Sequence, residues 1–119
     1  MATTALSALR DLDDGRHRAE LYRMWASGHG AGLTHPAILE TIGTRESRRT
    51  EAIRQWLLRG TRRGVGIADL VRPDDAPFDD FERALLAFGD EAGHLDEALR
   101  LLGDLYTSKH RLMLRVKKD

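Results

Sequence analysis

The chain has 119 residues, a formal net charge of zero and no cysteine. This length suits a single domain, the balanced charge argues against a general affinity for nucleic acid or anionic lipid, and the lack of cysteine excludes disulfides and thiolate metal sites. No apolar run approaches the ~20 residues of a membrane span, and the N-terminus has no pattern typical of a signal peptide.

The first half of the chain predicts three helices. Residues 1–15 are small and polar and are expected to form a flexible leader or a short helical turn. From residue 16 the apolar residues recur at helical spacing, until glycines after residue 27 end the helix. Thr34 can cap a second helix, and a third is expected to begin at Glu46 or Ser47 with Ile53 on its buried stripe.

The second half predicts three more helices, separated by glycines and prolines. A short helix is expected after Gly66, which can serve as its N-cap. The next helix has an expected apolar stripe of Phe78, Phe81, Leu85 and Phe88, and a last helix is expected over about residues 94–118. No segment alternates with period two, so residues 16–119 are predicted to fold as an all-α domain, an antiparallel bundle of about six helices.

The stretch GDEAGHLDEAL, residues 89–99, raises the question of a catalytic or metal site, since it groups Asp90, Glu91 and His94. Acid–base catalysis needs convergent groups in a cleft, and nothing in the pattern indicates one. Gly93 can instead adopt the left-handed conformation that closes a helix. We therefore interpret the stretch as the corner of a helical hairpin and expect no catalytic residue, no cofactor and no metal ligand; the acidic pairs at 74–75 and 79–80 are taken as solvated surface.

Charge is unevenly distributed along the chain. Residues 45–63 carry seven arginines against two glutamates, and residues 69–104 carry eleven acids against three arginines. Such segregation favours docking surfaces or internal pairing. The residues proposed for protein interaction are Asp79, Asp80, Asp90 and Glu91 on the acidic side, and Arg48, Arg49 and Arg59 on the basic side.

Several segments, taken in order, resemble a known family. AGLTHPAILETI at 31–42, RGVGIADLV at 63–71 and APFDDFERALLAFGDEAG at 76–93, followed by a long helix with a basic end, are similar to the cytoplasmic domain of the F-type platform proteins. These are inner-membrane proteins of type II secretion systems and type IV pilus machines. Two positions depart from the family pattern: Asp90 stands where glutamate is usual, and Gly66 replaces a serine cap.

The resemblance implies a function without catalysis. The domain would lie at the cytoplasmic face of the bacterial inner membrane, dock the assembly ATPase and other platform components, and form a homodimer. Such proteins have membrane spans that this chain lacks, so we expect a fragment cut just before the first span, and the basic end RLMLRVKKD fits that position. No nucleic-acid partner is implied.

Two alternatives stay open from the residues. AIRQWLLRGTRRGVGIADLV at 52–71 could form a helix-turn-helix of a nucleic-acid-binding regulator, with arginines on phosphates. The second helix of that motif would be short and would lack base-reading side chains. A naturally standalone helical adaptor is the other alternative.

Overall fold

The computed structural model describes residues 2–43 and 46–118, and over these residues it contains six helices and no strand. The helices are α1 (Ala2–Gly30), α2 (His35–Thr41), α3 (Arg48–Arg62), α4 (Ile67–Val71), α5 (Asp80–Ala92) and α6 (Leu95–Lys118). The prediction of an all-α bundle of about six helices is confirmed.

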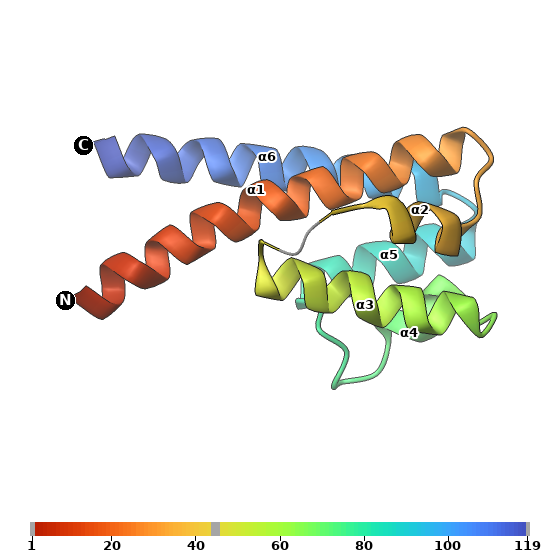
Figure 1. Ribbon diagram of the computed structural model, residues 1–119. Coiled ribbons are helices and arrows are strands. Elements are labelled where there is room, and N and C mark those ends of the chain that lie inside the picture. Colours follow the sequence, from red (N-terminus) through yellow and green to blue (C-terminus); the bar gives the residue numbers. More distant parts are fainter. Residues whose placement is uncertain (1, 44–45, 119) are drawn as a thin grey trace.

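Two long helices form the spine of the molecule (Figure 1). α1 and α6 run antiparallel and side by side, and the four shorter helices pack below them. The close approach depends on glycine: a Cβ on Gly103 of α6 would lie 2.8 Å from Cγ of Arg23 on α1. Both termini lie at the same end of the molecule, beyond the shorter helices.

The segment expected to be a leader differs from its prediction. α1 begins at Ala2 and continues through residues 15 and 16 without interruption, so residues 2–15 are helical. The physical reason is composition: residues 2–14 contain neither glycine nor proline, and alanine and leucine favour the helix. Polarity alone did not distinguish a helix from a loop.

Local capping residues define where the helices start and stop. The hydroxyl groups of Thr34 and Ser47 accept hydrogen bonds from Ala37 N and Thr50 N, as N-caps of α2 and α3. Gly66 is the N-cap of α4, and Gly93 ends α5 at φ +75°. The predicted hairpin corner between α5 and α6 is therefore present.

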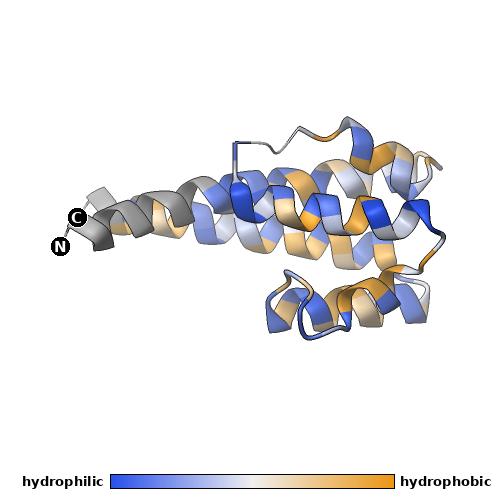
Figure 2. Cartoon of the chain, turned by 60° about the horizontal axis from the view of Figure 1, so that its bottom comes forward, coloured by the Kyte–Doolittle hydropathy of each residue, from blue (hydrophilic) through white to orange (hydrophobic). Residues whose placement is uncertain are grey.

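The core contains most of the apolar residues that helical spacing placed inside the bundle. Trp25, Leu39, Ile53 and Leu99 are fully buried, whereas Trp56 is half-buried and donates its Nε1 proton to Leu70 O at 2.7 Å. Hydrophobic and hydrophilic residues alternate along the helices as expected for amphipathic elements (Figure 2).

The expected apolar stripe of α5 is only partly correct. Phe78, just before the helix, is buried, but Phe81 and Phe88 are exposed. The face of α5 that points into the bundle is made of Glu82, Leu86 and Gly89. Helical spacing predicted an apolar stripe, but a neighbouring face of α5 is the one that is buried. Gly89 on that face permits close contact with α6, and Glu82 forms a buried ion pair with Arg18.

Candidate functional site

A buried ion network is centred on Arg18 of α1. Its Nη1 donates to both carboxylate oxygens of Glu82 on α5, at 3.0 and 2.9 Å. Its Nη2 donates to Asp14 at 3.1 Å, and its Nε donates to the hydroxyl of Thr50 on α3 at 3.2 Å. Arg18 thereby connects α1 with α3 and α5. All three nitrogens of its guanidinium group donate hydrogen bonds within the fold.

Other polar groups complete the network. Asp14 Oδ1 accepts from the hydroxyls of Ser47 and Thr50 at 2.7 and 2.8 Å. The phenol of Tyr22 donates to Glu82 Oε2 at 2.5 Å. The carboxylates thus receive hydrogen bonds in compensation for the water that burial removes.

Asp79 connects this network to the start of α5. It is the N-cap of α5 and forms a capping box with Glu82, in which each side chain accepts from the other residue's backbone N–H. Its second oxygen accepts from the phenol of Tyr106 on α6 at 2.8 Å. The same residues therefore start the helix and tie α5 to α6.

The electrostatics of the network follow from burial and pairing. Burial alone would lower the pKa of Arg18, but the carboxylates of Glu82 and Asp14 outweigh it and raise that pKa. Burial, together with the charge of Glu82, raises the pKa of Tyr22 well above its usual value. Burial would raise the pKa of Asp79, but the hydrogen bonds from Glu82 N–H and Tyr106 lower it. Arg18 is therefore always charged and Tyr22 always neutral at ordinary pH.

An open hollow of about 520 Å³ adjoins the network between α1, α3, α5 and α6. Residues of the network, among them Arg18 and Glu82, line the hollow, together with Arg49, Lys109 and His110. The ammonium group of Lys109 lies 5.4 Å from the ring centroid of Tyr106. Since the donors of the network are already engaged within the fold, the network acts as a structural junction that holds four helices.

The Asp90, Glu91 and His94 group does not converge on one point. Asp90 Oδ2 accepts from Ala68 N at 2.9 Å, Glu91 pairs with Arg72, and His94 lies 3.7 Å from Glu97 on the surface. Within residues 2–43 and 46–118, no three His, Asp or Glu side chains are arranged to hold a metal ion. The stretch is a corner whose acids have separate structural partners.

Asp90 has a specific role at this corner. Its carboxylate binds the second backbone N–H of α4, a helix whose own N-cap, Gly66, has no side chain to do so. Carboxylates are favourable at a helix N-terminus because the first N–H groups lack partners in the helix. Gly66 and Asp90, 24 residues apart in the sequence, therefore meet at the N-terminus of α4.

The acidic residues proposed for docking fall into two groups. Asp79 and Asp80 lie at the start of α5, and Asp90 and Glu91 lie near its end. Eleven residues of helix rise separate the groups by about 16 Å. Asp79, Asp80 and Glu91 are exposed and Asp90 is half-buried, and Asp79 and Asp90 also have capping roles.

The basic residues proposed for docking share α3 but not one point on it. Arg48 and Arg59 are exposed and eleven residues apart, which places them on the same helical face three turns from one another. Arg49 lies at the wall of the hollow. Arg54 of the same helix is buried, where it pairs with Glu51 and donates to Leu39 O at 2.7 Å. We name the exposed pair Arg48 and Arg59, with Arg49 beside the hollow, the arginine face; Arg54 is not part of it.

The sequence interpretation missed Arg18, Glu82 and Asp14. Charged residues are normally assigned to the surface, and their partners here are up to 64 residues away. One signal was available: Asp79 and Glu82 have the acid–x–x–Glu spacing of a capping box. It could have placed Glu82 at the start of a helix, but not in the core.

Comparisons of the chain with models of protein families, with curated proteins and with solved structures find no match. Among the helices described, none has the length and hydropathy needed to cross a bilayer.

Proposed function

We propose that this domain is the cytoplasmic domain of an F-type platform protein of a type II secretion or type IV pilus machine. It would act as a protein-docking module at the inner membrane that couples the assembly ATPase to insertion of pilin or pseudopilin subunits. The domain would perform no reaction, and self-association as a homodimer is part of the proposal.

The observation that carries the proposal is the contact between the two segments with the most distinctive spacing. RGVGIADLV at 63–71 and the GDEAGHL corner at 89–95 are joined by the hydrogen bond from Ala68 N to Asp90. The resemblance rested on the order of such segments along the chain. A direct contact between the two segments supports the view that they belong to one structural unit. Gly66 stands where the family has a capping serine, and the carboxylate of Asp90 takes over part of that capping.

The structure favours docking over the nucleic-acid alternative. A recognition helix must present side chains to a groove. α4 has five residues, and four of them, Ile67, Ala68, Leu70 and Val71, are buried. Only Asp69 of this helix is exposed, and its negative charge would repel phosphate.

The test is co-purification with the assembly ATPase encoded in the same genome. Reversing the charge of Arg48 and Arg59 together should weaken capture of the ATPase, whereas reversing exposed Arg100 on α6 should not. Equal capture by all variants would remove the arginine face from the proposal.

A further inference from the structure

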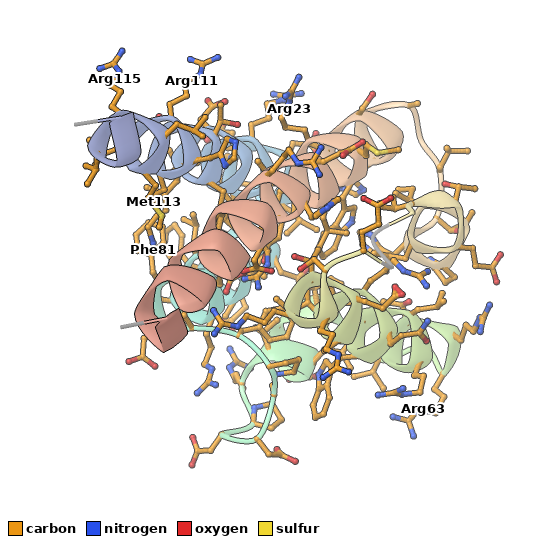
Figure 3. All side chains as sticks on the ribbon, turned by 60° about the vertical axis from the view of Figure 1, so that its left-hand side comes forward. Arg23, Arg63, Phe81, Arg111, Met113 and Arg115 are labelled. Carbon is orange, nitrogen blue, oxygen red and sulfur yellow. The ribbon has the colours of Figure 1, made fainter. Side chains whose placement is uncertain are left out.

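His35, the first residue of α2, lies in an enclosed position at the end of the molecule away from the termini (Figure 1). On the spine, by contrast, exposed charged side chains project into solvent, as Figure 3 shows for Arg23, Arg111 and Arg115. His35 is half-buried, and its ring meets the ring of Trp25 edge-on, with the centroids 5.8 Å apart. Because Trp25 is fully buried, packing fixes the surroundings of the His35 ring on that side.

The hydrogen bond between Trp25 and His35 determines where the imidazole can hold its proton. Trp25 Nε1 lies 3.1 Å from His35 Nδ1. An indole N–H can only donate, so Nδ1 is the acceptor and neutral His35 has its proton on Nε2. A protonated imidazole has an N–H group at both nitrogens. In that form two donors would face one another, and the fully buried Trp25 would lose its acceptor.

The charged groups around His35 come from three other helices. His29 of α1 stacks on the His35 ring with the centroids 5.0 Å apart, and its Nε2 lies 3.2 Å from Asp96 Oδ1 of α6. Asp90 of α5 lines the same hollow of about 190 Å³. Burial and then His29 lower the pKa of His35, and Asp90 opposes them. A proton on His35 therefore meets a facing imidazole, while the closest carboxylate, Asp96, is already paired with that imidazole.

The other polar contacts of α2 hold the second half of this helix. Arg54 of α3 donates to Leu39 O at 2.7 Å, and Glu40 pairs with Arg62 of α3. The start of α2 instead follows a turn with Gly32 at φ +85°. A glycine can change its backbone angles at little steric cost. The first turn of α2 can therefore move away from α1 while its second half stays bound to α3.

We propose that the contact between His35 and Trp25 is an acid-sensitive switch: protonation of His35 breaks the contact, and the start of α2 moves away from α1 and uncovers Trp25. The rest of the bundle stays folded, because the ion network around Arg18 contains no residue of α2. Local opening of this kind costs less free energy than global unfolding. The apolar surface of Trp25 then becomes accessible to a partner in acid only. The switch does not depend on the docking function proposed above.

Fluorescence of Trp25 in the full chain tests the switch. Trp56→Phe first removes the other of the two tryptophans. In this background the constant for quenching by acrylamide should rise roughly twofold or more as the pH is lowered, with a midpoint below the ordinary histidine pKa of about 6.5. His35→Asn supplies an uncharged acceptor for Trp25 Nε1 and should abolish the rise. His94→Asn should leave it unchanged, and it is the matched control because the His94 side chain is 62% exposed.

Nuclear magnetic resonance of the wild type separates a local opening from other effects of acid. The ring nitrogens of neutral His35 should have the chemical shifts of the form protonated at Nε2. As His35 titrates, the indole N–H of Trp25 should exchange faster with water, while the backbone amides in the middle of α6 stay protected. His29→Asn removes the facing charge and should move the midpoint to higher pH. These measurements do not depend on Trp56→Phe, so they test the switch even if that variant fails to fold.

Three results would overturn the inference. If quenching and indole exchange stay constant while His35 titrates, the contact survives protonation and there is no switch. If the rise in quenching persists in His35→Asn, another group causes it. If the α6 amides lose protection in the same transition as the Trp25 indole, acid unfolds the whole domain instead of opening one corner.

Discussion

Replacing Arg18 by methionine removes the cation at the centre of the buried ion network. The side chains of Arg18 and Glu82 are 7% and 1% exposed, so Glu82 would be left as a buried charge without its cation. Removing one partner of a buried ion pair costs roughly 3–5 kcal/mol. Glu82 keeps the hydrogen bonds from Tyr22 and from Asp79 N–H, which favours the lower end of that range, about 3 kcal/mol.

This loss is large for a domain of this size. Total stability of a small domain is about 5–15 kcal/mol, and 3 kcal/mol corresponds to a fall in Tm of roughly 10–20 °C. Urea unfolding followed by circular dichroism would measure it, with exposed Arg59→Met as the control, expected within about 0.5 kcal/mol of wild type.

A double variant separates the buried charge from lost packing. Arg18→Met combined with Glu82→Gln removes the uncompensated charge and keeps an acceptor for Tyr22, so it should be more stable than Arg18→Met alone by about 1 kcal/mol or more. If Arg18→Met costs less than about 1 kcal/mol, or if the double variant is no more stable than the single one, the network does not hold the helices as argued.

Three further predictions concern the caps, the close contacts and the histidine at the α1–α2 corner. Asp90→Ala should cost about 1 kcal/mol in urea unfolding, because α4 loses its carboxylate cap, and adding Gly66→Ser should recover part of that loss. Gly60→Ala should cost roughly 1–3 kcal/mol, since its new Cβ would lie 2.0 Å from a leucine methyl group of α4. Burial and the nearby His29 lower the pKa of His35, whose Nδ1 accepts a hydrogen bond from Trp25 Nε1 at 3.1 Å. The stability that neutral His35 contributes should therefore be fully present above the unfolded-state pKa of about 6.5 and should be lost as the pH falls below that value. His35→Gln should flatten this part of the pH profile, measured by thermal unfolding.

Each of these has a result that would count against it. Equal stability of Asp90→Ala and wild type would mean that water caps α4 as well as the carboxylate does. The control for Gly60 is Gly43→Ala, where a new Cβ has no neighbour within 4 Å, and the two substitutions should differ clearly. An unchanged acid profile in His35→Gln would show that His35 does not cause the loss of stability in acid.

Sequence patterns determined the helical class and most helix boundaries, because the signals for these are local. Thr34 and Gly66 cap the helices they were expected to cap, and Gly93 closes α5. Ser47, one of the two residues expected to begin the third helix, is its N-cap. Caps depend on backbone groups within three residues, so they can be recognised without knowledge of the fold. The GDEAGHLDEAL stretch was likewise readable as a corner, since the glycine and the following acids act within one turn.

Only the tertiary structure decided which faces are buried and which charges meet. α5 has two faces that could enter the core, and the one with Glu82 does so because Arg18, 64 residues away, neutralises it. Helical periodicity describes each face equally well but contains no information on the partner. Burial depends on contacts between distant segments, and for that reason Phe81 and Phe88, the two aromatic residues of their helix, remain at the surface.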